Sequence, residues 1–399
     1  MNSKVHKKIA EASNIYLLFF LCIFSCSAPF AQDAADTSGK YRVIAAGPQY
    51  GTSAFHRFFW GEHYRREWTT PVKVPLIYLD TIAGGLIPYK PGGGRQSKTV
   101  RLRNASGKEY VLRSIDKTFG RALPDVYRNT FIENIIDDQV SIAHPYAAVT
   151  IPVMAEAAHI YHTWPQIGFV PRQPALDMFN NEYGNTLYLL EQRPDENWEE
   201  AAHFGKSKNI IGTEKLFEKI RKNPNHQVDQ LAYIRARLFD MFIGDWGRHE
   251  DQWRWATLEA GDKKVYRPIP RDRDQTYTKF DGALLQLILS ATGLKHLQTF
   301  DYTIKDVARY NFPARHLDRQ LANEPSLQQW TEIAIDLQQR ITNAVIEEGV
   351  KQLPPELFPI SGSEIIAKLK ARRDQLVHFA AAYYLFLAKE VDVVGTEAD

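Results

Sequence analysis

Cysteine is almost absent from this chain: only Cys22 and Cys26 occur among its 399 residues. Both lie in an N-terminal segment that we expect to be removed or processed on export, so disulfide bonds cannot hold the mature protein together. An excess of one charge is also missing, because 49 Lys and Arg residues face 47 Asp and Glu residues, a net charge of +2. That balance argues against a protein that binds nucleic acid.

The long apolar run of this sequence is too short to cross a membrane. It spans Ile15–Phe24 and has ten residues, about half the length that a membrane-spanning helix needs. Three lysines precede it and small residues follow it, which is the pattern of a secretory signal. We therefore expect residues 1–31 to be a signal peptide that is cleaved after Ala28 or Ala31.

The segment around Cys26 leaves two forms of the exported protein open. It loosely resembles a bacterial lipobox, in which Cys26 would become an acylated first residue that anchors the protein to a membrane surface. Phe24 fits that motif poorly, and the alternative is an exported protein without an anchor. In both forms we expect the protein in the periplasm or at the outer membrane, without a membrane-spanning helix in the mature chain.

Composition indicates a folded globular protein, since 44% of the residues are hydrophobic and 24% are charged. After the signal peptide, residues 32–80 are rich in aromatic and basic side chains, and we expect them to form an extended arm. Residues 81–193 are rich in strand signals, whereas residues 194–393 are mainly helical in pattern.

Three short antiparallel strands are expected early in the β-rich part, over Leu86–Tyr89, Ser97–Arg103 and Glu109–Ile115. The last two alternate apolar and polar residues, which is typical of a half-buried strand. The loop between the first two contains consecutive glycines, which let backbone N–H groups approach an anion closely. These glycines are Gly92, Gly93 and Gly94.

The rest of the chain supplies the helices and an acidic loop. The expected elements are helices over 125–142, 151–161 and 227–243, strands over 185–192, 252–258 and 264–269, and two long C-terminal helices, the second from a capping box at Ser361–Glu364 to about residue 390. The helix over 227–243 leads directly into the segment FIGDWGRHEDQWRW, and a second acidic segment, IPRDRDQTY, follows the strand pair. Phosphoryl transfer uses parts of this kind: a loop over the phosphates, a cation on them and carboxylates for Mg²⁺.

The two acidic segments carry a resemblance to known proteins. GRHEDQ followed by IPRDRDQTY resembles the catalytic core of the atypical kinases, such as the HipA-type serine kinases, the type II phosphatidylinositol 4-kinases, the Golgi secretory kinases and the CotH-type kinases. The resemblance implies an α+β, two-lobed protein-kinase-like fold with a β-rich N-lobe over 81–193 and a mainly helical C-lobe over 194–393. It also implies ATP with Mg²⁺ or Mn²⁺. Residues 45–395 further resemble an exported protein family of Bacteroidetes-type bacteria, which implies an envelope location rather than an activity.

The kinase resemblance implies three groups of site residues. The nucleotide would be held by Gly92, Gly93, Gly94, Arg113, Lys117, Glu156 and Glu191. The metal would be held by Asp272, Gln252, Asp251 and Asp274. The catalytic loop would supply Asp245, Arg248 and His249. Within these groups, Glu156 would be the acidic partner of the phosphate-binding cation, and Glu191 would begin the hinge.

Two positions depart from the kinase pattern and leave an inactive form open. The aspartate of the kinase loop aligns with Gly247, and Asp245 lies two residues earlier, which moves a carboxylate by several ångströms. The expected phosphate-binding Lys aligns with Arg113, with Lys117 as the alternative. If active, the protein would transfer phosphate to a hydroxyl of a protein, lipid or sugar. If inactive, it would be a pseudokinase, a binding or assembly module that works with outer-envelope proteins.

Two further interpretations of the acidic segments stay open. A metal-dependent phosphoesterase would use His249, Asp251, Asp272 and Asp274 as metal ligands. A purely structural interpretation expects a self-neutralising ion-pair network between the loop and the turn. Its members would be Arg248, Glu250, Asp251, Arg271, Arg273 and Asp274.

Overall fold

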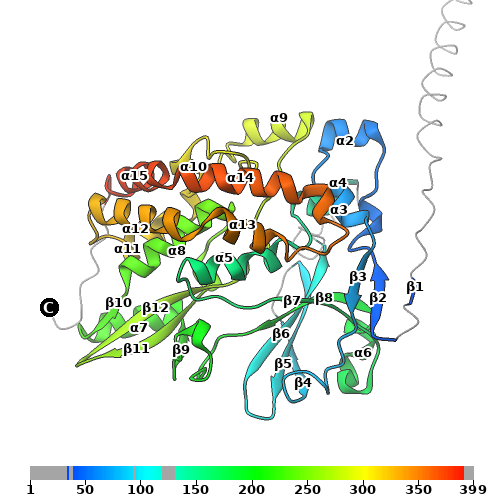
Figure 1. Ribbon diagram of the computed structural model, residues 1–399, viewed down its shortest axis with the longest axis horizontal. Coiled ribbons are helices and arrows are strands. Elements are labelled where there is room, and N and C mark those ends of the chain that lie inside the picture. The colour runs from blue at the N-terminus through cyan, green and yellow to red at the C-terminus, as the bar shows by residue number, and fades with distance from the viewer. Residues whose placement is uncertain (1–33, 36–38, 93–95, 119–130, 391–399) are drawn as a thin grey trace, which may run out of the picture. The chain divides into compact units, whose positions relative to one another are not determined.

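Short strands dominate the first half of the chain and long helices the last third, as the computed structural model shows (Figure 1). The structure describes residues 34–35, 39–92, 96–118 and 131–390. The expected signal peptide with Cys26, and the glycines Gly93 and Gly94, lie outside the described residues. Within those residues, no helix is both long enough and apolar enough to traverse a bilayer.

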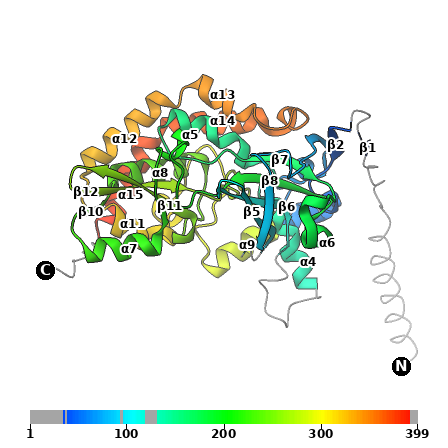
Figure 2. The same cartoon turned by 90° about the horizontal axis from the view of Figure 1, so that it is seen from below.

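The strands form three sheets, and the two larger ones lie side by side (Figures 1 and 2). The largest is antiparallel with the order β4-β5-β6-β8-β7, the next has the order β10-β12-β11-β9, and the smallest has the order β1-β2-β3. The strands are β1 (Ala34–Ala35), β2 (Tyr41–Ile44), β3 (Val72–Pro75), β4 (Leu86–Pro91), β5 (Ser97–Asn104), β6 (Glu109–Lys117), β7 (Gln166–Val170), β8 (Thr186–Gln192), β9 (Ile210–Gly212), β10 (His226–Val228), β11 (Trp253–Ala260) and β12 (Lys263–Pro270).

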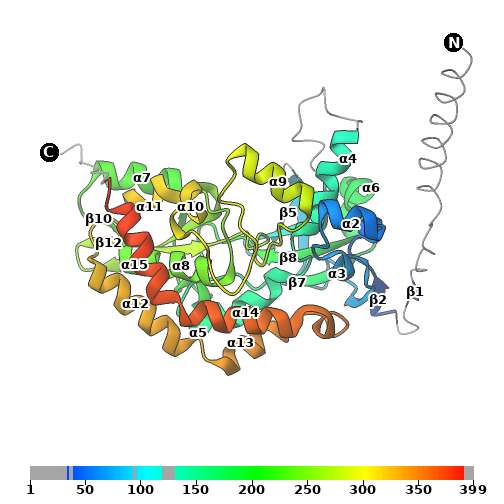
Figure 3. The ribbon, with the colours of Figure 1, turned by 90° about the horizontal axis from the view of Figure 1, so that it is seen from above.

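The helices gather mainly on one side of the strands (Figures 1 and 3). They are α2 (Ala54–Trp60), α3 (Arg65–Thr69), α4 (Phe131–Asp138), α5 (Ile151–Ala157), α6 (Asn180–Tyr183), α7 (Thr213–Lys222), α8 (Gln230–Ile243), α9 (Ala283–Thr292), α10 (Val307–Tyr310), α11 (Arg315–Leu321), α12 (Leu327–Arg340), α13 (Asn343–Val350), α14 (Ser363–Asp374) and α15 (Leu376–Leu387). Helix α8 lies among them, in contact with α12, α14, α15 and strand β12. The protein is thus a mixed α/β structure with several sheets and many helices.

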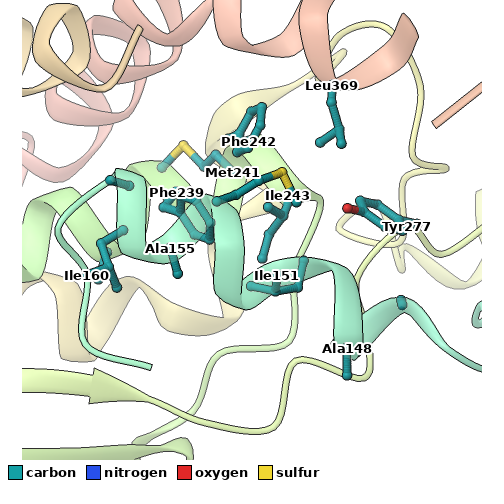
Figure 4. Packing of buried hydrophobic residues seen from close by; sticks show 14 of the residues in the cluster. Ala148, Ile151, Ala155, Ile160, Phe239, Met241, Phe242, Ile243, Tyr277 and Leu369 are labelled. Carbon is teal, nitrogen blue, oxygen red and sulfur yellow. The ribbon is translucent and has the colours of Figure 1, made fainter. Parts of the chain in front are cut away.

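Helix α8 is the centre of the main hydrophobic core (Figure 4). Its residues Phe239–Ile243 are all fully buried, and α5 and α14 pack beside them through residues such as Ala155 and Leu369. The helix begins at the N-cap Asp229, whose side chain accepts a hydrogen bond from the N–H of Ala232 at 2.9 Å. It ends at Gly244, which has a positive φ of 79°. This firm stop fixes where the acidic loop after α8 begins.

The segment before the first large sheet is folded rather than extended. Residues 32–80 were expected to form an extended arm, but they contain strands β2 and β3 and helices α2 and α3. Tyr64 and Trp68 are buried in the main core, and the indole N–H of Trp68 donates to the carbonyl of Ala143 at 2.8 Å. Tyr64 and Trp68 therefore serve packing against the rest of the protein, whereas Phe55 and Phe58 of the same segment are exposed.

The long C-terminal helix that the sequence predicts is interrupted. The structure divides it into α14 and α15 at Gln375, whose φ and ψ are −100° and 2°. The Gln375 side chain donates to the carbonyls of Tyr302 and Ala371, at 2.8 and 3.0 Å. The expected capping box at Ser361–Glu364 is also absent, because Ser361 and Gly362 lie in a short π-helical turn that leads into α14.

Candidate functional site

A polar cleft of about 720 Å³ lies between the five-stranded sheet and the segments that flank β11 and β12. Its walls include Gly92, His249 and three carboxylates, those of Asp251, Asp272 and Asp274. Cationic side chains outnumber these carboxylates two to one. They are Arg101, Arg113, Lys117, Arg193, Arg254 and Arg271. A cleft lined in this way attracts anions.

Strand alternation decides which residues of the large sheet face the cleft. Along β5, Val100 and Leu102 are fully buried in a core on one face. Thr99 and Arg101, which alternate with them, line the cleft. Strand β6 repeats the pattern, because Arg113 pairs with Thr99 in register and also lines the cleft. The sheet therefore presents its polar face to the site and its apolar face to a separate core.

Gly92 lies at the end of β4, where the strands approach closely. Its N–H donates to the carbonyl of Thr99 at 2.6 Å. A Cβ atom at position 92 would lie 2.6 Å from the Cβ of Thr99, closer than real atoms of this kind approach. Only glycine fits here without a shift of the backbone. Of the three glycines expected to cradle phosphates, Gly92 is the described one, and it lines the cleft.

Asp272 stands where the strand β12 turns back toward the cleft. Its φ is 56°, a left-handed backbone conformation that non-glycine residues rarely adopt. Its carboxylate forms an ion pair with Arg113 of β6, and Arg271 lies 4.0 Å away. Burial alone would raise the pKa of Asp272, but Arg113 and Arg271 outweigh that effect, and its pKa lies at about 2.

Arg113 also lies beside Glu191, the residue at which the kinase hinge was expected to begin. Glu191 on β8 is buried, and its Oε2 lies 3.9 Å from the Arg113 guanidinium. Burial raises the pKa of Glu191, and Arg113 opposes that rise. Burial also disfavours the charged form of Arg113, but Asp272 and Glu191 outweigh it and raise the Arg113 pKa. Arg113 is thus a cation held in place by two carboxylates.

Lys117 and Asp274 form the second ion pair across the cleft, with 2.5 Å between Nζ and Oδ2. Lys117 lies at the end of β6 and Asp274 in the turn after β12, 157 residues later. The two expected phosphate-binding cations are therefore each matched with one of the expected metal-binding carboxylates. The structure brings these four residues together in one cleft.

Glu156 does not reach this site. The kinase resemblance made it the acidic partner of the phosphate-binding cation, but its side chain is exposed on α5. Its charge acts instead near His203, whose pKa lies at about 4 because burial and His162 lower it more than Glu156 raises it. Among the described residues, the carboxylates that pair with Arg113 are those of Asp272 and Glu191.

The loop after α8 divides into a buried part and an exposed part. Asp245 and Arg248 are almost completely buried and paired with each other, so neither lines the cleft. His249 and Asp251 are exposed and do line it. Gln252 is buried, and its side-chain oxygen accepts the N–H of His249 at 3.3 Å, which makes it a cap for the short turn after the loop.

Arg248 belongs to a cluster of charges built around Asp240, in the interior of α8. The Asp240 carboxylate accepts from Arg248 at 3.0 Å, from Arg237 at 2.9 Å and from Arg273 at 2.8 Å. Asp240 itself is fully buried. These four residues are here called the buried arginine cluster. The ion-pair interpretation of the sequence is thus partly confirmed for Arg248 and Arg273, but with a carboxylate that the sequence did not single out.

Asp245 sits at the edge of the buried arginine cluster. Burial and the neighbouring Asp240 raise its pKa, whereas Arg248 lowers it, and the net shift is upward. Its Oδ1 is buried and accepts no hydrogen bond from the described residues. Asp245 is therefore part of the scaffold of the loop and does not line the cleft.

The loop after α8 and the turn after β12 lie next to each other. The N–H of Arg271 donates to the carbonyl of Gln252 at 2.9 Å, which joins the turn to the end of the loop. Asp251 and Asp272 then line the same cleft, opposite Gly92. In the part of the chain that the structure describes, no group of three or more His, Cys, Asp or Glu side chains is arranged to hold a metal ion.

Several cleft residues were not anticipated from the sequence. Arg101 lies on the polar face of a predicted strand, so strand alternation was the signal that could have found it. Arg254, Arg271 and Arg193 reach the cleft only because the hairpin of β11 and β12 lies beside the large sheet. That packing depends on contacts between distant parts of the chain, and no local pattern announces it.

Comparison with known proteins finds a distant structural similarity. No protein-family model matches the chain, and no curated protein matches it. Among solved structures, the chain is similar to the proinflammatory kinase CtkA of Helicobacter pylori, with 10% sequence identity and a TM-score of 0.37. The likeness covers 77% of this chain and 97% of the CtkA chain.

Proposed function

We propose that this protein binds a nucleotide by its phosphates in the polar cleft, together with a divalent cation, as a kinase-like protein. The observation that carries the proposal is the convergence of Gly92, Arg113 and Lys117 from the large sheet with Asp272 and Asp274 from the turn after β12. A loop glycine, cations for phosphate and carboxylates for Mg²⁺ are the parts that phosphoryl transfer needs.

The residues of the cleft fit a divalent cation that is shared with phosphate. Mg²⁺ is usually held by one or two carboxylates plus substrate phosphates, so a complete cage of protein ligands is not required. Asp272 is the first candidate ligand, because its low pKa keeps it ionised and its Oδ1, although paired with Arg113, receives no well-aligned hydrogen bond. Asp274 and Asp251 line the same cleft. A bound cation would offset the negative charge of the phosphates.

The geometry supports binding more directly than transfer. Asp245, the residue expected to orient an acceptor hydroxyl, is buried against Arg248. Gly247, at the kinase aspartate position, has no carboxylate. Asp251 and His249 line the cleft and are the groups left to contact an acceptor. An active phosphotransferase would need Asp251 to orient the acceptor, whereas an inactive nucleotide-binding protein would not. Substitution of Asp251 therefore distinguishes the two.

The test is thermal unfolding of the mature protein with ATP, ADP or no nucleotide, each with Mg²⁺, Mn²⁺ or a chelator. Binding to the folded state must raise the apparent stability by mass action. The expected result is a rise with nucleotide and metal together that Asp272→Ala removes. The matched control is Asp262→Ala, which replaces an acidic residue in the turn between β11 and β12, outside the cleft.

The same samples separate transfer from binding alone. Stabilisation with formation of ADP that Asp251→Asn abolishes supports a phosphotransferase. Stabilisation without ADP formation supports a pseudokinase. The absence of any shift with every nucleotide and metal would contradict the proposal and favour an assembly module of the envelope.

We also propose that the protein is exported, from its N-terminal sequence alone. Mass spectrometry of the mature N-terminus from envelope fractions tests this. Cleavage after Ala28 or Ala31 supports a signal peptide, an acylated Cys26 supports a lipid anchor, and an intact Met1 contradicts export.

A further inference from the structure

Two arginines of the cleft carry charges that no carboxylate balances closely. No carboxylate among the described residues lies within salt-bridge distance of Arg254, which donates only to the carbonyl of Trp253 at 3.0 Å. Its Nε is buried without a hydrogen-bond partner. The carboxylate nearest to Arg271 is that of Asp272 at 4.0 Å, and Asp272 is already paired with Arg113. Buried polar atoms are normally paired, so the Nε of Arg254 is an exception.

The two side chains point to the same face of the hairpin. Trp253 of β11 pairs with Pro270 of β12, and the N–H of Arg271 donates to the carbonyl of Gln252 at 2.9 Å. Arg254 and Arg271 are therefore diagonal neighbours on one face, near enough for both to contact a single small anion. Both line the cleft together with Arg193.

Several arginine side chains lie close together in this part of the cleft. Arg113 is paired with Asp272 and Glu191, and Arg193 is paired with Glu109 and Asp195. Arg254 lies in the same cleft without a carboxylate partner among the described residues. Guanidiniums gathered in one partly dry cleft destabilise the folded protein unless an anion binds among them.

We propose that Arg254 and Arg271 form a second anion subsite, which binds a phosphate group beside the phosphates of the nucleotide. The inference rests on the proposed function and adds the substrate class: the molecule that binds next to the nucleotide already carries a phosphate. The planar guanidinium fork matches phosphate oxygens in pairs of hydrogen bonds, whereas the ammonium of lysine does not. The proposed site for the nucleotide phosphates differs, because its cations Arg113 and Lys117 are paired with Asp272 and Asp274.

Calorimetric titration of inorganic phosphate into the protein saturated with ADP and Mg²⁺ tests the inference. The expected result is binding of one phosphate per chain with ADP still bound. In the double variant Arg254→Gln/Arg271→Gln, the phosphate affinity is expected to fall about tenfold or more. The affinity for ADP is expected to stay within about threefold of its original value, since other residues hold the nucleotide.

The matched control replaces an arginine on the same hairpin that lies outside the cleft. Arg267 of β12 is paired with Asp229 at 2.8 Å, and Arg267→Gln is expected to leave phosphate binding unchanged. If the double variant fails to fold, the single variants Arg254→Gln and Arg271→Gln replace it, and each is expected to weaken phosphate binding several-fold.

The outcomes separate this inference from the proposed function. Mutually exclusive binding of phosphate and ADP would overturn it and assign both arginines to the nucleotide. Equal phosphate affinity in the original protein and in the Gln variants would overturn it as well. If ADP does not bind at all, the proposed function fails, and phosphate titrated into the protein alone still decides whether Arg254 and Arg271 form an anion site.

Discussion

The buried arginine cluster and the cleft place the same residue type in two different settings. In the cluster, three guanidiniums converge on Asp240, a carboxylate of the scaffold itself, and all four residues are removed from water. In the cleft, six cationic side chains face three carboxylates. In the cluster, the cations share a carboxylate of the fold, although Nε and Nη2 of Arg273 have no hydrogen-bond partner among the described residues. In the cleft, the cations outnumber the lining carboxylates, which is why we propose that an external anion binds there.

One tetrapeptide contributes to both regions. In Arg271–Asp274, the side chain of Arg273 turns inward to Asp240, whereas Arg271, Asp272 and Asp274 line the cleft. The positive φ of Asp272 marks the point where the chain changes direction. The ion-pair interpretation of this segment therefore holds for Arg273, although its partner is Asp240. The site roles of Asp272 and Asp274 stay predictions.

The largest expected effect comes from removing the hub of the buried arginine cluster. Asp240→Ala leaves Arg237, Arg248 and Arg273 without their shared carboxylate, and breaking a buried pair in this way costs about 3–5 kcal/mol. Chemical denaturation is expected to show that loss in the free energy of unfolding, or no folded protein at all.

A partly exposed carboxylate with two arginine partners is the control for Asp240. Asp336 of α12 pairs with Arg235 at 2.6 Å and with Arg340 at 2.8 Å, but its side chain is 33% exposed. Asp336→Ala is expected to cost about 1 kcal/mol or less, as solvent-exposed ion pairs do. Equal losses in the two variants would show that burial does not distinguish the two settings.

The next effect concerns the strand contact at the edge of the cleft. Gly92→Ala forces a Cβ atom against Thr99, and overpacking of this kind costs about 1–3 kcal/mol. Gly247→Ala is the control, because its Cβ would lie 3.6 Å from Gln275, an ordinary contact. Denaturation midpoints that fall equally for both variants would contradict the close approach at Gly92.

The pH dependence of stability is expected to differ between the two regions. The Asp245 pKa is raised in the folded protein, so its contribution to stability is present below about pH 4 and is lost as the pH rises. The Asp272 pKa is lowered to about 2, so its contribution is present above about pH 4 and is lost as the pH falls toward 2.

Two amide variants measure these opposite slopes. Relative to the original protein, Asp245→Asn is expected to gain stability as the pH rises from 4 to 7, by on the order of 1 kcal/mol per unit of pKa shift. Asp272→Asn is expected to lose relative stability over the interval from about pH 2 to pH 4, where the carboxylate of the original protein ionises. The measurement is urea unfolding across this pH range, and slopes of the same sign would contradict the assignment.

The smallest expected effect on stability comes from breaking the Lys117–Asp274 ion pair of the cleft. Lys117→Gln removes the ion pair with Asp274, whose side chain is 27% exposed, and is expected to cost less than about 1 kcal/mol. The same variant is expected to weaken nucleotide binding clearly. A large loss of stability together with unchanged nucleotide binding would assign Lys117 to the fold rather than to the site.

Local patterns in the sequence predicted the parts of the fold that are built from neighbouring residues. Strand alternation located β5 and β6, apolar spacing located α8, and the turn signals between them gave the order of the elements. The convergence of Asp272 with the loop after α8 could be predicted too, because the strand pair β11 and β12 returns the chain to where it began. The two ends of a hairpin lie close together, and a hairpin can be predicted from neighbouring residues alone.

Partners from distant segments could not be predicted. Asp240 occupies one position of an apolar helix, and nothing in α8 shows that Arg273 will reach it. Glu191, rather than Glu156, lies beside Arg113, because the pairing of β6 with β8 decides which carboxylate is near. The break at Gln375 likewise depends on a contact with Tyr302. Each of these is settled by tertiary packing that overrides the local pattern.

The most direct test of the nucleotide site is the affinity of ATP for the protein with Mg²⁺ and with a chelator, measured by calorimetry. The account expects tighter binding with Mg²⁺ in the original protein. It expects Asp272→Asn to bind ATP with the same affinity in both conditions, and Arg113→Gln to bind it weakly in both. An ATP affinity that depends on Mg²⁺ to the same extent in Asp272→Asn, or no ATP binding by the original protein, would contradict it.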